Sequence, residues 1–213
     1  VGDGADVDTA EIIQGLIRHV EINSQADVAY DTAFEHAVIG GFGFIRVLTQ
    51  YCDEMSFDQE CTIERVIDPF TVYFDPSCQK ADYSDAEFCF VVEDLTIDQY
   101  KARYPKSQMA GLSEFRSTGD DEKLWYGQDH IRVAEYFRIE TEEKTLVKLT
   151  SGKSVLKDEI AEGDEIAVGA DGNPVTRKTF LRVVKWSKIN AKEEMDAADV
   201  PGLWIPIIPV IAD

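Results

Sequence analysis

Residues 34–76, FEHAVIGGFGFIRVLTQYCDEMSFDQECTIERVIDPFTVYFDP, decide how this chain folds. The stretch opens inside an apolar helical segment. Gly40 and Gly41 end the predicted helix, because glycine tolerates the left-handed conformation of a helix C-cap. Residues 43–51 then alternate as in a strand and carry apolar groups on both faces. We therefore expect a central strand directly after the glycines.

A hairpin and a short strand complete the stretch. Residues 61–67 alternate as well, and the acidic, polar link at 53–60 predicts a hairpin between the two strands. Asp-Pro pairs at 68–69 and 75–76 bracket the short segment 71–74. Since proline removes a backbone donor from a sheet, this third strand must be short and bounded there. The stretch specifies a scaffold rather than an active site.

Two helices are predicted at the start of the chain. The first spans residues 9–22, with Asp8 as its cap and Glu11 at the capping-box position. The second spans residues 25–39, with Ser24 as a candidate cap, and its wide apolar face indicates packing against a large surface. The apolar face of the first helix comprises Ile13, Leu16, Ile17 and Val20.

After the stretch, an acidic loop at 77–87 leads to a predicted strand at 88–93. Thr96 is expected to cap a short helix with Gln99 at the capping-box position, and Pro105 closes that helix.

The second half of the chain is rich in predicted strands. The acidic, glycine-rich segment 150–178 is expected to form a hairpin or an exposed loop, and residues 188–198 are expected to be weakly helical. The predicted strands are 131–139, 144–149, 179–186 and a final proline-punctuated strand after the turn at 199–202.

These elements predict an α+β fold, in which helices pack on mostly antiparallel β-sheet and a second, smaller lobe is β-rich. We place the helix-plus-sheet lobe at residues 1–115 and the β-rich lobe at 116–213, because residues 106–127 show little periodicity. The chain lacks an initiator methionine and ends on the apolar segment 205–210, so we expect it to be a fragment of a longer protein.

The charge balance limits the partners of the chain. It carries 41 acidic and 21 basic residues, for a net charge of −20. Affinity for nucleic acid comes largely from basic side chains that neutralise phosphates, so we do not expect tight binding of DNA or of an anionic membrane by the chain as a whole. A local basic patch stays open, although no basic run exceeds two residues, as at Arg177-Lys178. We expect no transmembrane helix and no signal peptide.

The glycine cluster Gly40-Gly41-Phe42-Gly43 does not predict a nucleotide site. A phosphate loop needs a lysine followed by serine or threonine, and here Phe44 and Ile45 follow. A dinucleotide-binding fingerprint places its glycines after a strand and before a helix, which is the reverse of the order expected here. We interpret the cluster as a helix stop with a tight entry into a strand.

Two acidic groups are the candidate metal sites. Hard cations prefer several carboxylate oxygens, but neither spacing matches an EF-hand loop, so solvated loops are favoured and a weak cation site is the minority interpretation. The first group is Asp75, Asp82, Asp85 and Glu87; the second is Asp158, Glu159, Glu162, Asp164 and Glu165.

Cysteine, histidine and tryptophan form no recognisable motif. Free thiols are favoured for Cys52, Cys61, Cys78 and Cys89, with disulfides or a zinc site as alternatives. His19, His36 and His130 are interpreted as structural, although the two helices could bring the first two together. Trp125, Trp186 and Trp204 are expected in a core or an interface. We therefore predict no catalytic, metal-binding or cofactor-binding residue and no cofactor.

The order of elements resembles that of bacteriophage portal proteins of the short-tailed, podovirus type. The resemblance covers residues 9–140 well and is looser at 184–189 and 201–210. It is carried by 10–20 (AEIIQGLIRHV), 29–47 (AYDTAFEHAVIGGFGFIRV), 65–90 (RVIDPFTVYFDPSCQKADYSDAEFCF) and 91–105.

The resemblance implies a structural subunit without enzymatic activity, in a ring of typically twelve copies at one capsid vertex. Double-stranded DNA enters and leaves through such a ring without sequence-specific binding. The implied partners are the terminase, scaffolding, coat and tail adaptor proteins, with no membrane. The implied locations are the virion and, during assembly, the bacterial host cytoplasm. The segment resembles the outer wing, and the stem helices and clip are not evident in it. The resemblance therefore implies neither direct DNA contact nor ring formation by this segment alone.

Two other functions stay open. One is a metal-dependent hydrolase that uses the acidic loop 75–87, which metal-dependent thermal stabilisation would favour. The other is an acidic protein-interaction domain, which a parent gene next to terminase and coat genes would argue against.

Overall fold

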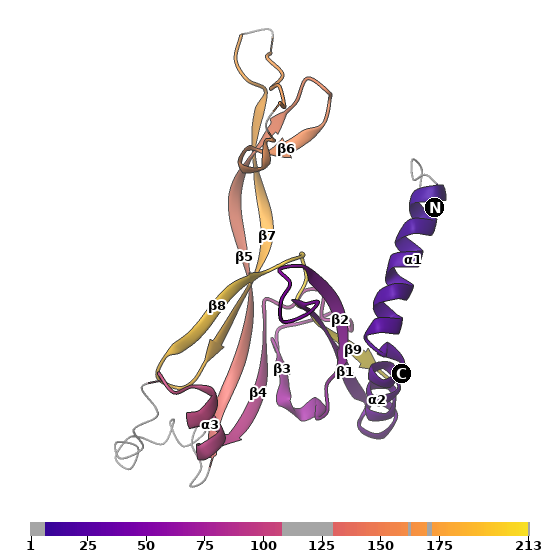
Figure 1. Cartoon of the computed structure of the whole chain (residues 1–213), viewed down its shortest axis with the longest axis vertical. Helices are drawn as coiled ribbons and strands as arrows, with labels where there is room; N and C mark the ends of the chain where they lie inside the picture. Colours follow the sequence, from indigo (N-terminus) through magenta and orange to yellow (C-terminus); the bar gives the residue numbers. More distant parts are fainter. Residues whose placement is uncertain (1–6, 108–129, 162, 170–171, 213) are drawn as a thin grey trace.

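The structure is a computed structural model that describes residues 7–107, 130–161, 163–169 and 172–212. Within these ranges three α-helices pack with two antiparallel β-sheets, which confirms the predicted α+β class. Figure 1 shows a body that holds both sheets, a long two-stranded ribbon that projects from it, and a helix that stands to one side.

Helices α1 (Val7–Asn23) and α2 (Ala26–Gly40) lie close to the predicted ranges, but their caps differ. Asp8 lies inside the first turn of α1 and not before it. The Ser24 hydroxyl donates to the Val20 carbonyl at 2.6 Å, so it serves the end of α1. Gln25, with a left-handed φ of 51°, precedes α2 and makes no side-chain cap. The predicted Ser24 cap is therefore wrong, because the connection is too short to free that hydroxyl.

The smaller sheet has the strand order β2–β1–β9, comprising β2 (Gln59–Arg65), β1 (Phe42–Tyr51) and β9 (Ile207–Ile211). The β1–β2 hairpin and the central place of β1 confirm the sequence predictions. Strand β9 pairs with the start of β1, with Gly43 opposite Val210. The first and the last strand of the described chain are thus neighbours in one sheet.

The glycine cluster sets how α2 meets this sheet. Gly41 has a φ of 88°, and its N–H donates to the Ala37 carbonyl, as the predicted C-cap requires. A Cβ at Gly43 would lie 2.1 Å from the Ala33 carbonyl oxygen, so only glycine allows this approach of strand to helix. The buried face of α2 consists of Ala26, Ala29, Ala33 and Ala37.

The larger sheet has the order β3–β4–β5–β7–β8, and β6 pairs with the far end of β5. A 3-10 turn at Pro69–Thr71, capped by the Asp68 side chain, leads into β3, and a second at Lys157–Glu159 follows β6. Helix α3 (Ile97–Arg103) begins with the predicted capping box of Thr96 and Gln99. The strands are β3 (Val72–Phe74), β4 (Phe88–Thr96), β5 (His130–Lys148), β6 (Ser154–Leu156), β7 (Thr176–Ile189) and β8 (Glu194–Val200).

Two predictions in this sheet were wrong. The strands expected at 131–139 and 144–149 are one strand, β5, because the charged residues between them pair with β7 throughout. The segment 188–198, expected to be weakly helical, contains the turn into β8. Asn190, only 5% exposed, accepts the N–H groups of Lys192 and Glu193 at 2.8 and 2.9 Å and so forms that turn. Pairing with β7 outweighs the helical propensity of this polar segment.

The two sheets enclose the main core. It contains Phe44 and Ile207 from the smaller sheet and Cys89, Phe137 and Val184 from the larger one, all at most 4% exposed. Strand β4 pairs with β5 over nine residue pairs, so strands from both sides of the predicted 115/116 boundary share a sheet. The division into two lobes stays a prediction, and residues 108–129 lie outside the described residues.

Among the helices that the structure describes, none is both long and apolar enough to cross a membrane.

Candidate assembly surface

Helix α1 contacts α2 and β2 but buries none of its residues. The predicted apolar face exists, yet Leu16 is 61% and Ile17 53% exposed. Figure 1 shows α1 rising away from both sheets. Since apolar groups at helical spacing normally face a core, this face indicates a partner outside the described residues.

The outer side of α2 adds to this surface. Phe34 is 66%, Val38 64% and Ile39 78% exposed, although the alanines of the same helix are buried against β1. Helix α2 thus packs against a sheet with its alanine face only, and its other apolar side is not covered by the described residues. We give the name helix surface to eight exposed apolar residues of α1 and α2, each more than half exposed: Ile12, Ile13, Leu16, Ile17, Ile22, Phe34, Val38 and Ile39.

A polar junction ties the two sheets together. Arg46 of β1 donates to Glu135 of β5 with 2.5 Å between Nη2 and Oε2, and the Trp186 indole N–H of β7 donates to the same oxygen at 2.9 Å. Lys188 Nζ lies 4.0 Å from the other carboxylate oxygen. The Arg46 and Glu135 side chains are 20% and 16% exposed, so the pair is largely withdrawn from water.

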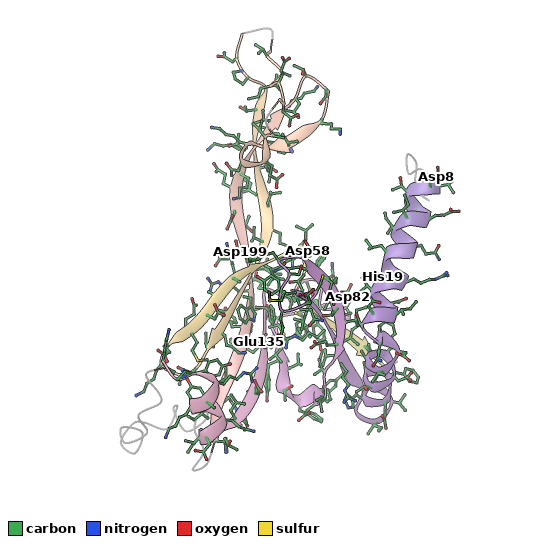
Figure 2. All side chains as sticks on the ribbon, viewed as in Figure 1. Asp8, His19, Asp58, Asp82, Glu135 and Asp199 are labelled. Carbon is green, nitrogen blue, oxygen red and sulfur yellow. The ribbon has the colours of Figure 1, made fainter. Side chains whose placement is uncertain are left out.

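A groove of about 520 Å³ opens beside this junction, between β1 and β8. Figure 2 shows Glu135 and Asp199 in this central region. Lys185 donates to Glu142 at 2.8 Å and to Asp199 at 2.9 Å, and these bonds raise its pKa. The groove is therefore bordered by side chains that are already paired, which suits a structural contact between sheets.

The acidic loop 75–87 uses its carboxylates to hold its own backbone. Asp75 accepts the N–H groups of Ser77 at 2.8 Å and Glu87 at 3.3 Å, and Asp85 accepts that of Gln79 at 2.8 Å. Hydrogen bonds from Ser77 lower the pKa of Asp75, and the Gln79 N–H lowers that of Asp85. These carboxylates are accordingly ionised and stabilise turns of the loop.

The minority interpretation of the two acidic groups, a weak cation site, gains no support. Asp82 accepts the Ser84 N–H at 3.0 Å, which lowers the pKa of Asp82. In the second acidic group, Asp164 accepts the Ala161 N–H at 3.2 Å, and Glu162 lies outside the described residues. Across the described ranges, no three His, Cys, Asp or Glu side chains gather in a way that could hold a metal ion.

All four cysteines are free thiols, as predicted, and none forms a disulfide. Cys52 and Cys61 are exposed. Burial raises the pKa of Cys89, and burial together with Asp85 and Asp75 raises that of Cys78. Thiols whose pKa is raised stay protonated, which makes them poor nucleophiles and poor metal ligands.

The histidines and tryptophans fall in different surroundings. His19 Nε2 lies 3.0 Å from the Asn23 amide nitrogen on the same helix, and His130 pairs with Thr96 across β4 and β5. His36 Nδ1 is buried and has no hydrogen-bond partner among the described residues. Arg182 lies over the Trp204 ring at 4.6 Å from its centroid. Trp125 lies outside the described residues.

The Arg46–Glu135–Trp186 junction was not predicted, because its members are far apart in the sequence. One feature of the sequence indicates a buried polar contact of this kind. Arg46 is the only charged residue in the predicted strand 43–51, where its neighbours are mainly apolar. A charge placed there needs a buried partner, although the sequence does not say which one.

Comparison with known proteins shows similarity over the entire chain. The family model described as "Phage P22-like portal protein" matches residues 1–213. A protein named "Portal protein", from Acyrthosiphon pisum secondary endosymbiont phage 1, is 32% identical over 214 residues. That alignment covers 94% of this chain and 29% of the relative, so the chain spans less than a third of the relative's length.

Proposed function

This chain belongs to the family of phage P22-like portal proteins, and from this premise we propose that it is part of a structural subunit of the portal ring at one capsid vertex. The observation that carries the proposal is the similarity over the whole chain, with 32% identity to a phage portal protein. The ring would serve as the conduit through which double-stranded DNA is packaged and ejected.

We assign this region to the outer wing of the subunit. Its described residues form two packed sheets, a projecting ribbon and three helices of 7 to 17 residues, which suits a peripheral part better than a channel wall. The carboxylates of the acidic loop are engaged in local turns, which supports a scaffold role over hydrolysis.

The net charge of −20 supports passage of DNA without capture. Each phosphate held by a basic side chain would slow a moving duplex, whereas an acidic surface repels it. We expect the chain not to bind duplex DNA at physiological salt; micromolar affinity in a fluorescence anisotropy titration would contradict this account.

The helix surface is the proposed contact surface within the assembled ring. Other partners would be the terminase, scaffolding, coat and tail adaptor proteins, in the virion and, during assembly, in the host cytoplasm. A contact surface of this kind should matter for assembly but little for the stability of the region by itself, because its side chains already face water.

Electron microscopy of the full-length protein tests the ring directly: rings with a central hole are expected, and a strictly monomeric protein would refute the proposal. Leu16→Glu with Ile17→Glu tests the helix surface. We expect this variant to lose rings in the full-length protein, while the unfolding free energy of the 213-residue chain changes by less than about 0.5 kcal/mol. Gln14→Glu, which adds a charge on the same helix without removing an apolar group, is the matched control.

A further inference from the structure

The β5–β7 ribbon leaves two strand edges uncovered. Strand β4 pairs with β5 up to Arg138, and β6 begins to pair at Leu146, so among the described strands residues 140–145 pair with β7 alone. Strand β8 starts to pair with β7 at Val184, so residues 176–183 pair with β5 alone within the part of the chain that the structure describes. Figure 1 shows this part of the ribbon standing clear of the body.

The direction of the backbone groups follows from hydrogen bonds at both ends of the open part of β5. The Ile139 N–H donates to Glu87 on the β4 side, and the Leu149 N–H donates to Lys153 on the β6 side, each at 2.8 Å. Because these groups alternate along a strand, the N–H and C=O groups of Thr141, Glu143 and Thr145 face the open edge.

The same reasoning gives the open edge of β7. In an antiparallel pair of strands, the backbone N–H and C=O groups of two directly opposite residues either both point toward the partner strand or both point away from it. The β7 partners of the three outward residues are Arg182, Phe180 and Lys178, so their backbone groups face the other open edge. Phe180 is 69% exposed there. Unpaired edges of this kind are templates for another strand.

The two edges carry opposite charge. Segment 140–145, ETEEKT, holds three glutamates and one lysine, whereas segment 176–183, TRKTFLRV, holds three basic residues and no acid. Three basic residues with no acid among eight positions stand out in a chain of net charge −20. Within one copy the strands already attract each other, as the 2.6 Å ion pair between Lys178 and Glu143 shows.

We propose that the basic β7 edge of one copy pairs with the acidic β5 edge of the next copy, and this rests on the proposed portal function. Pairing of β7 with β7, or of β5 with β5, would oppose like charges and is disfavoured. Pairing of β7 with β5 is heterologous, so each copy still offers a free edge of each kind and the contact can repeat around a ring. In a ring all ribbons point the same way, so the new pair is antiparallel, like the pair within each copy.

Charge reversal in the full-length protein tests the proposal. One variant carries Arg177→Glu and Lys178→Glu; the other carries Glu140→Lys and Glu143→Lys. Each variant alone presents two edges of the same sign, so both should lose the rings that wild type forms at 0.15 M salt or less, where the screening length is about 8 Å or more. Near-UV circular dichroism checks that each variant is folded.

Mixing separates contacts between copies from contacts within a copy. In an equal mixture of the two variants, each acidic edge can pair with a basic edge of the other variant. The two variants then alternate, so rings with an even number of subunits should form. A single chain with all four substitutions should also form rings. If the four-substitution chain assembles and the mixture does not, the charges act within the chain and the proposal is overturned.

Two further results would overturn it. One is assembly of either two-substitution variant as in wild type, in which case the basic strand serves another partner such as an acidic peptide or DNA. The other is that folded variants stay unassembled both in the mixture and in the four-substitution chain. Wild-type protein that forms no rings would instead refute the proposed function, before any variant is compared.

Discussion

Replacement of Gly43 by alanine tests whether close approach of α2 to β1 shapes this fold. The new Cβ would lie 2.1 Å from the Ala33 carbonyl oxygen, which is backbone and cannot rotate away. Helix and strand would have to separate by more than about 1 Å to restore van der Waals distance. The separation would loosen the small cluster in which Ala29 and Ala33 pack on Ile45. Overpacking of this kind typically costs about 1–3 kcal/mol, and we expect the upper half of that range.

The neighbouring glycines provide matched controls. Alanine at Gly40 meets no atom within 4 Å and sits in a helical conformation, so it should stabilise the chain by up to about 1 kcal/mol. Alanine at Gly41 also has room, but the φ of 88° should cost about 1–2 kcal/mol.

Urea unfolding of the 213-residue chain, followed by circular dichroism, measures the series. The midpoint should fall in the order Gly40→Ala, Gly41→Ala, Gly43→Ala at an unchanged slope. A Gly43→Ala variant within about 0.5 kcal/mol of wild type would refute the reasoning, since surface changes alone fall in that range.

Three more predictions concern single contacts. Thr96→Ala removes the cap of α3 and should cost about 1 kcal/mol in urea unfolding, whereas Thr96→Ser should cost far less; equal effects would argue against the cap. Glu135→Ala should cost about 3 kcal/mol and shift the fluorescence of Trp186, because a largely buried arginine and an indole N–H lose their acceptor; an unchanged midpoint would contradict this. Arg132 lowers the pKa of Asp94, so this pair stabilises the fold above the ordinary carboxyl pKa of about 3.9 and less as pH falls through the lowered value. Wild type should therefore exceed Asp94→Asn in stability at pH 6 and lose that advantage below pH 4, and a constant difference would exclude the pair as its source.

Local rules predicted much of the fold. Alternation identified β1 and β2, the Asp-Pro pairs bounded β3, and the Thr96 capping box began α3. Each of these signals lies within a few residues of the feature that it predicts, so no knowledge of distant partners is needed.

The failures share a different cause. The charged middle of β5 reads as a break between strands, and it is a strand only because β7 lies beside it. Segment 188–198 reads as helix, and it pairs with β7 after the turn formed by Asn190. The Arg46–Glu135 contact joins residues 89 positions apart. Partners of this kind are set by topology, which a single sequence does not display.

Helix α1 and the open part of the β5–β7 ribbon share one physical property, which is that both have little tertiary packing among the described residues. Helix α1 buries none of its 17 residues, whereas most helices in proteins are stabilised by tertiary packing of an amphipathic face. The open part of the ribbon is two strands wide, and an isolated pair of strands is only marginally stable in water. Both elements carry residue patterns that exposure to solvent alone does not explain. Helix α1 has apolar residues at helical spacing, and the two ribbon edges have opposite charges. Such patterns are best explained by contacts that form only in an assembled protein, so the free energy that orders these elements should come in large part from the proposed ring.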